Sequence, residues 1–264
     1  MPWVQCGPTD VHYEDRGAGP PLVFIHGALS SGETWYRHLE AFSARYRVLA
    51  YDSVNHGLSS NSPRDEPEPD RADEPEAFLS ALGIERPILA GQSMGGMTIL
   101  RWAIRHLSAA QALIISGMGV PREPMRGPSP LQQPLDNDTL FLEVGASFTP
   151  AFYASQPLLI DRYLRVRSTA VRLEAQRHTR AVTAVNPAWE PTALAEGVKR
   201  ITSPMQIIVG SLDSLKPLTD YLHELAPSSH YEVIEGAAHS AHYECFDTYR
   251  RIVEDFLEPI QAQM

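Results

Sequence analysis

The stretch Pro87-Ile88-Leu89-Ala90-Gly91-Gln92-Ser93-Met94-Gly95-Gly96 decides the fold expected for this chain. Its first four residues form an apolar run typical of a short buried strand, and the residues after Ser93 put Met97, Leu100 and Ile104 on one face of a helix. Ser93 therefore stands on a tight turn between a strand and a helix, which projects its hydroxyl outward. Glycines flank the serine because a Cβ would clash in so crowded a backbone.

Two further candidate residues follow apolar strands later in the chain. Asp213 comes just past Met205–Val209, and His239 lies in the loop after Tyr231–Ile234. The chain order Ser93, Asp213, His239 is that of nucleophile, acid and base in α/β-hydrolases, and it differs from the orders in chymotrypsin and subtilisin.

Two N-terminal motifs extend this likeness. The strand Pro21–Ile25 runs into His26-Gly27-Ala28-Leu29, and the next predicted strand runs into the loop Tyr51–Ser59, which contains Asp52, Asn55 and Gly57. Together the motifs resemble those of the α/β-hydrolase superfamily, over about residues 11–120 and 200–260. The resemblance implies that the backbone N–H groups of Ala28 and Met94 form an oxyanion hole.

The three candidate side chains suit nucleophilic catalysis. A serine hydroxyl needs a base to remove its proton, and His239 would serve as that base and later protonate the leaving group. Asp213 would hold the imidazole in the required tautomer. Each oxyanion-hole donor would contribute on the order of 3 kcal/mol. This chemistry requires no metal and no organic cofactor, and the sequence has no H-E-x-x-H or Cys/His cluster for zinc.

Each assignment competes with a plainer one. Ser93 could be an ordinary turn serine, and Asp213 could be a helix cap with Asp220 as the true acid. His239 competes as the base with His242 and His230, but the Gly-x-x-His spacing favours His239. His26 is more easily understood as a structural hydrogen-bonding residue than as a base.

The apolar pattern predicts an α/β fold with a mostly parallel central sheet flanked by helices. The expected strands are Val11–Asp15, Leu22–His26, Arg47–Tyr51, Ile88–Gly91, Ala112–Ser116, Met205–Val209 and Tyr231–Ile234. Besides the helix after Ser93, the expected helices are Glu33–Phe42, Pro75–Leu82, Thr219–Ala226 and Tyr243–Leu257.

The long interval between two strands predicts a second unit. Residues 1–120 and 194–264 are expected to form the core domain, and residues 121–193 an inserted helical cap, an insertion common in this superfamily. The helical pieces expected in the cap are Leu140–Phe148, Pro157–Arg167 and Ser168–Val185. The candidates for lining an apolar substrate pocket are Leu29, Phe141, Phe148, Phe152 and His242. The alternative for the phenylalanines is that they pack the cap onto the core.

Composition narrows the function classes. The chain has 264 residues and a net charge of −10, which argues against nucleic-acid and anionic-membrane partners and leaves a small-molecule substrate. With only Cys6 and Cys245 no disulfide framework can form, so a cytoplasmic location is expected. No leader segment is visible, and no apolar run approaches the roughly 18 residues of a membrane span. The oligomeric state is left open.

The expected reaction is hydrolysis of a carboxylic ester, lactone or thioester of a small, largely apolar substrate through an acyl-serine intermediate. Serine at the turn argues against the superfamily branches that use aspartate there, the haloalkane dehalogenases and epoxide hydrolases. A carbon–carbon bond hydrolase is the nearest alternative, and perhydrolase or acyltransferase activity would differ only in what resolves the acyl-enzyme. A non-catalytic protein of the same fold that binds a small ligand is the alternative from another class.

Overall fold

The computed structural model describes residues 2–61, 70–123, 147–177 and 190–262. Its eight-stranded sheet has the order β1-β2-β4-β3-β5-β6-β7-β8. The β1–β2 and β2–β4 pairs are antiparallel, and every pair from β4 onward is parallel. The strands are β1 Trp3–Cys6, β2 Thr9–Arg16, β3 Pro21–Ile25, β4 Arg47–Tyr51, β5 Ile88–Gln92, β6 Ala112–Ser116, β7 Met205–Gly210 and β8 His230–Ile234. The predicted fold class, a mostly parallel sheet flanked by helices, is confirmed.

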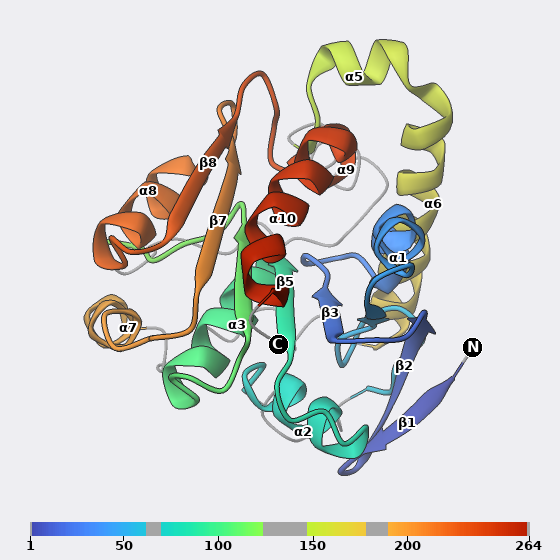
Figure 1. Cartoon of the computed structure of the whole chain (residues 1–264). Helices are drawn as coiled ribbons and strands as arrows, with labels where there is room; N and C mark the ends of the chain where they lie inside the picture. The colour runs from blue at the N-terminus through green and yellow to red at the C-terminus, as the bar shows by residue number, and fades with distance from the viewer. Residues whose placement is uncertain (1, 62–69, 124–146, 178–189, 263–264) are drawn as a thin grey trace.

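Helices cover both faces of the sheet (Figure 1). Helices α1 and α10 lie on one face, and α2, α3, α7 and α8 lie on the other. The helices are η1 Gly32–Trp35 (a 3-10 turn), α1 Tyr36–Phe42, α2 Asp73–Ala81, α3 Met94–Arg105, α5 Pro150–Ser155, α6 Pro157–Arg177, α7 Pro191–Val198, α8 Lys216–Leu225, α9 Ala241–Glu244 and α10 Phe246–Gln261. Helix α5 lies at the top of the view in Figure 1, and α6 contacts η1.

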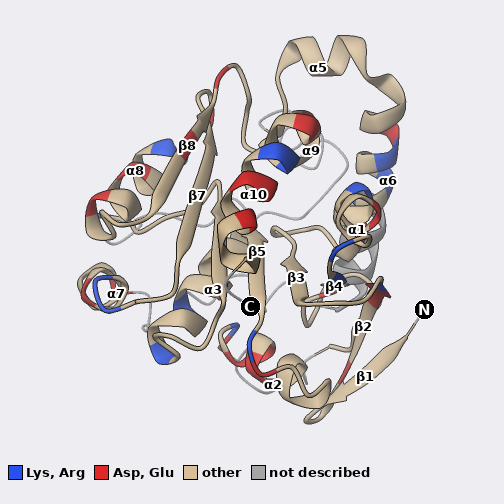
Figure 2. Cartoon of the chain, in the orientation of Figure 1, with Lys and Arg blue, Asp and Glu red and all other residues tan. Residues whose placement is uncertain are grey.

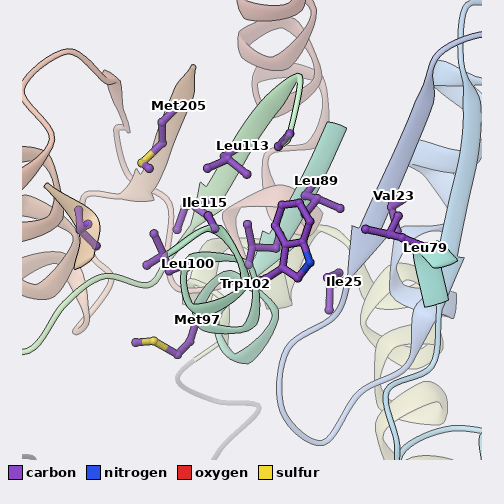
Figure 3. Packing of buried hydrophobic residues seen from close by; sticks show 14 of the residues in the cluster. Val23, Ile25, Leu79, Leu89, Met97, Leu100, Trp102, Leu113, Ile115 and Met205 are labelled. Atoms are coloured by element: carbon purple, nitrogen blue, oxygen red, sulfur yellow. The ribbon is translucent and has the colours of Figure 1, made fainter. Parts of the chain in front are cut away.

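Alternation along the strands divides the core into two clusters. In β3, for example, Val23 and Ile25 belong to the cluster under α3, whereas Leu22 and Phe24 belong to the cluster under α1 and α10. Figure 3 shows the first cluster, with Trp102 of α3 packed among side chains of the central strands. Because both faces of these strands are covered, they read as continuous apolar runs.

Charged residues lie outside this core. Figure 2 shows Lys, Arg, Asp and Glu along the covering helices and none on β5 or β7. In the described part of the chain, no helix combines the length and apolarity that crossing a bilayer requires.

Several element boundaries differ from those predicted. The edge strand β1 was not predicted, because only one of its four residues is buried and it is held by antiparallel pairing with β2. The predicted Glu33–Phe42 helix begins as the 3-10 turn η1, and the C-terminal helix is divided into α9 and α10. Helix α6 is continuous across the junction predicted between Arg167 and Ser168. The predicted helix Leu140–Phe148 lies almost entirely outside the described residues.

Candidate active site

Ser93 occupies a strained junction between β5 and α3. Its backbone has φ 53° and ψ −116°, and residues other than glycine rarely adopt a positive φ. The Ser93 N–H donates to the Ser116 carbonyl of β6 at 2.9 Å, and its own carbonyl accepts the Met97 N–H at 3.0 Å. Strain of this kind persists only where the surroundings enforce it, and it is concentrated at functional sites. The side chain is half-buried, which leaves part of it open to a ligand.

The glycines beside Ser93 are required by close backbone contacts. A Cβ on Gly91 would lie 2.5 Å from the carbonyl carbon of Gly95. A Cβ on Gly95 would overlap the backbone carbonyl oxygen of Ile25. These contacts bear out the sequence argument that any side chain here would clash.

Asp213 and His239 form a direct hydrogen bond. Nδ1 of His239 lies 2.9 Å from Oδ2 of Asp213, and the other carboxylate oxygen accepts the Leu215 N–H at 2.9 Å. The Asp213 side chain is fully buried, whereas 23% of the His239 side chain is exposed. The carboxylate is therefore fixed, and the imidazole keeps one edge accessible.

The strand order brings these two residues to the same end of the sheet as Ser93. Ser93 follows β5, Asp213 follows β7 and His239 follows β8, and β6 lies between β5 and β7. Gly117, directly after β6, lies beside this pair: a Cβ there would be 2.9 Å from Oδ2 of Asp213 and 3.3 Å from Nδ1 of His239. The Ser93 N–H bonds to the carbonyl of Ser116, the residue before this glycine.

The two candidate oxyanion donors flank Ser93 on separate elements. Met94 is the first residue of α3, where backbone N–H groups have no acceptor within the helix. Ala28 follows Gly27, which lies close to Ser93: a Cβ on Gly27 would be 3.4 Å from the Cβ of Ser93. Leu29, the next residue, is 1% exposed and has φ 57°, so the loop that carries Ala28 is tightly constrained.

His26 has the structural role expected of it. Nδ1 of its ring lies 2.7 Å from the Gly27 carbonyl oxygen, and Nε2 accepts the Ser53 N–H at 3.0 Å. Burial lowers the pKa of His26 to about 4. The neutral ring therefore joins the loop after β3 to the loop after β4.

The rival residues have other surroundings, and His242 is buried near His239. Asp220, on α8, pairs with Lys216 at 2.7 Å and accepts a hydrogen bond from the hydroxyl of Tyr231 on β8. His230 is exposed and packs its ring edge-on against Phe256. His242 is 3% exposed, with its ring 4.4 Å from that of Trp35. Burial, reinforced by the neighbouring His239, lowers the pKa of His242 to about 3.

The predicted pocket residues have different surroundings. Phe148 and Phe152 are buried, with ring centroids 5.0 Å apart and ring planes tilted by 33°, in a cluster with Ile160, Tyr163 and Tyr243. This packing fits the alternative in which they join the cap to the core, and contact with a substrate stays a prediction. Phe141 lies outside the described residues.

Two polar residues beside His239 were given no role from the sequence. The buried Gln92 side chain approaches the His239 carbonyl oxygen at 3.4 Å, and Glu244 accepts the N–H of Ala238 at 3.1 Å. Neither contact has a local sequence signal, because partners so placed depend on the tertiary fold. Within the described ranges, no group of three or more His, Cys, Asp or Glu side chains could hold a metal ion.

Comparison with known proteins agrees with this architecture. The model of the "Alpha/beta hydrolase family" matches residues 22–253. The chain is 28% identical to 2-hydroxy-6-oxononadienedioate/2-hydroxy-6-oxononatrienedioate hydrolase of Paraburkholderia phymatum, over 94% of this chain and 90% of that one. It is 25% identical to a non-heme haloperoxidase of Rhodococcus erythropolis, over 98% and 100% of the two chains. The crystal structure of the enol-lactonase from Burkholderia xenovorans superposes with a TM-score of 0.79 at 20% identity, over 97% of this chain and 100% of that one.

Proposed function

This chain belongs to the alpha/beta hydrolase family, and from that premise we propose that it is a serine hydrolase acting on a carboxylic ester, lactone or thioester of a small, largely apolar substrate. One observation carries the proposal. The strained Ser93, with φ 53°, shares one end of the sheet with a buried carboxylate that is bonded to a partly exposed imidazole. A nucleophile, a base and a group that orients the base are the parts that acyl transfer requires.

In the proposed reaction, Ser93 Oγ attacks the substrate carbonyl carbon while Nε2 of His239 takes the serine proton. The N–H groups of Ala28 and Met94 stabilise the oxyanion that forms on the carbonyl oxygen. His239 then protonates the leaving alcohol or thiol, and an acyl-serine remains. A water molecule, deprotonated by His239, attacks that ester, which releases the acid and restores the Ser93 hydroxyl.

The proposal includes a cap over residues 121–193. Its support is the apolar ring cluster of Phe148, Phe152, Ile160 and Tyr163, which packs against Tyr243 close to the loop that carries His239. An apolar surface so near the site favours an apolar acyl or ring group on the substrate. A cytoplasmic location is also part of the proposal, since Cys6 and Cys245 are free thiols.

The likeness to the dienedioate hydrolase supports a second candidate, in which the same groups hydrolyse a carbon–carbon bond of an oxo-dienedioate. The likeness to the haloperoxidase supports a third, in which hydrogen peroxide resolves the acyl-serine in place of water. All three candidates share Ser93 as the nucleophile or as a hydrogen-bonding group. The first two differ in the bond that is cleaved, and the third differs from the first in using hydrogen peroxide in place of water.

The test is labelling with a fluorophosphonate followed by intact-mass analysis. The wild-type protein is expected to gain one phosphonyl group, and Ser93→Ala is expected to gain none. A panel of acetate to decanoate esters, lactones and an oxo-dienedioate then identifies the substrate class. Equal labelling of wild type and Ser93→Ala would refute the assignment of the nucleophile. A wild-type protein that is neither labelled nor active would indicate a ligand-binding member of the family.

A further inference from the structure

The carboxylate of Glu244 joins the loop that carries His239 to the first helix after residue 147. Oε2 accepts the N–H of Ala238 at 3.1 Å. Oε1 accepts the N–H of Thr149 at 3.1 Å and also the Thr149 hydroxyl. Thr149 is the N-cap of α5, where its Oγ1 accepts the Phe152 N–H at 3.2 Å. One side chain therefore connects the residue before His239 to the start of α5, which lies next to α9 in Figure 1.

Other bonds fasten the same loop on the far side of His239. The Ser240 N–H donates to the Ser147 carbonyl at 2.8 Å, and the Ser240 and Tyr163 hydroxyls lie 3.2 Å apart. The Tyr243 hydroxyl donates to the Leu159 carbonyl at 2.9 Å. His239 is thus held from both sides: on its N-terminal side Glu244 accepts the Ala238 N–H, and the Leu212 N–H donates to the Ala237 carbonyl at 3.0 Å.

We propose that Glu244 is a positioning residue, which fixes the backbone before His239 and so holds the imidazole in line with Ser93. The inference rests on the proposed function, in which His239 is the base. A displacement of about 1 Å in a catalytic group can lower the rate roughly a hundredfold. Loss of the Glu244 bond would let the loop that carries His239 move and would therefore slow the reaction. Through Glu244, the segment 147–163 thereby helps to hold the loop that carries His239.

The chemistry of the three donors makes a carboxylate necessary. Ala238 N–H, Thr149 N–H and the Thr149 hydroxyl all donate, and a carboxylate has two oxygens that only accept. In Glu244→Gln the amide keeps the shape but has one acceptor and one donor. Its NH₂ must then face either the Ala238 N–H or the Thr149 N–H, and a donor opposite a donor forms no bond.

The experiment uses the full-length protein and compares three variants. Glu244→Gln disrupts the bridge, whereas Thr149→Val removes the hydroxyl that donates to Glu244 and caps α5 but keeps the bonds from the Thr149 and Ala238 N–H groups. Glu76→Gln is the matched control, because the Glu76 carboxylate also accepts a neutral N–H, from Trp102 at 3.0 Å, far along α3 from Ser93. For each, the rate of Ser93 labelling by a small fluorophosphonate and the kcat and KM for p-nitrophenyl acetate and hexanoate are measured, with the thermal midpoint as a check on folding.

We expect Glu244→Gln to lower the labelling rate and kcat about tenfold, by the same factor for both esters, with little change in KM. Thr149→Val and Glu76→Gln are expected to stay within about twofold of wild type in labelling. If Glu244→Gln does not fold, Glu244→Asp answers the same question, because it keeps both acceptors but shortens their reach, and the same loss of labelling is expected.

Two results would overturn the inference while leaving the proposed function intact. One is a folded Glu244→Gln that is labelled at the wild-type rate. The other is a loss confined to KM and larger for hexanoate than for acetate, which would mean that Glu244 shapes the pocket and does not position His239. A wild-type protein that is not labelled at Ser93 would instead refute the proposed function, and this inference with it.

Discussion

Asp213 and His239 meet beyond the ends of β7 and β8, with Oδ2 of the carboxylate 2.9 Å from Nδ1 of the ring. The carboxylate cannot turn freely, because Oδ1 is held by the Leu215 N–H at 2.9 Å. An ionised carboxylate only accepts hydrogen bonds, so the proton of a neutral His239 belongs on Nδ1. Nε2 is then the free acceptor, which is the tautomer that a base for serine needs.

This arrangement predicts the effect of Asp213→Asn. The amide NH₂ would face either Nδ1 of His239, favouring the wrong tautomer, or the Leu215 N–H, so kcat for a p-nitrophenyl ester is expected to fall on the order of ten-thousandfold. Asp220→Asn, on the surface of α8, is the control and is expected to change kcat by less than about threefold. Circular dichroism should show both variants folded. Near-normal turnover in Asp213→Asn would mean that another carboxylate orients the base.

The central parallel strands could be predicted because nearly all of their residues are buried. β5 and β7 are buried at every position, so each is a mostly apolar run with a glycine at or next to its end. β1 could not be predicted in the same way, because it has one buried residue in four and depends on hydrogen bonds to β2. The continuity of α6 was not predicted. The sequence was divided into two helices at Arg167 and Ser168, because apolar periodicity alone does not show whether two neighbouring helical segments are joined.

The site likewise contains residues that could be predicted from the sequence and residues that could not. Ser93, Asp213 and His239 could be singled out because each follows an apolar strand, and parallel strands end on the same edge of the sheet. Glu244 and Gln92 could not, because Glu244 bonds a residue 95 positions away and Gln92 one that is 147 positions away. Such contacts are set by how loops fold over the sheet edge, and no periodicity encodes them.

The adjacent glycines Gly95 and Gly96 are expected to differ sharply in their tolerance of alanine. A Cβ on Gly95 would overlap the Ile25 carbonyl oxygen and lie 2.8 Å from that of His26, and neither backbone group can move away easily. A Cβ on Gly96 would meet the Cβ of Met118 at 3.2 Å, a contact that a small shift relieves. Both substitutions gain about 1 kcal/mol of helix propensity, so overpacking decides the difference.

We therefore expect Gly95→Ala to lower the free energy of unfolding by at least about 2 kcal/mol relative to Gly96→Ala. Urea denaturation of the two variants at neutral pH measures this difference. The two variants share one turn of α3 and one substitution, so each serves as the control for the other. Equal midpoints would show that the loop between β3 and η1 yields to a side chain at residue 95.

The buried imidazole of His242 predicts how stability depends on pH. Burial, together with the neighbouring His239, lowers its pKa to about 3 in the folded protein, whereas histidine in an unfolded chain titrates near 6.5. Between these values the unfolded chain binds a proton that the folded one does not. Stability is therefore complete above about pH 6.5 and is lost as the pH falls through this window, by about 1.4 kcal/mol per pH unit for one such group.

Burial lowers the pKa of His26 to about 4 and that of His38 well below its usual value, so both act in the same direction. His242→Gln removes one of these titrations, and we expect it to reduce the slope of unfolding free energy against pH by about 1.4 kcal/mol per unit between pH 4.5 and 6. Urea denaturation across this range measures both slopes. Above pH 7 wild type and variant should run parallel, whatever the variant costs in absolute stability. Parallel curves at acid pH as well would show that the folded protein accepts a proton on His242, and that water reaches the ring cluster it shares with Trp35.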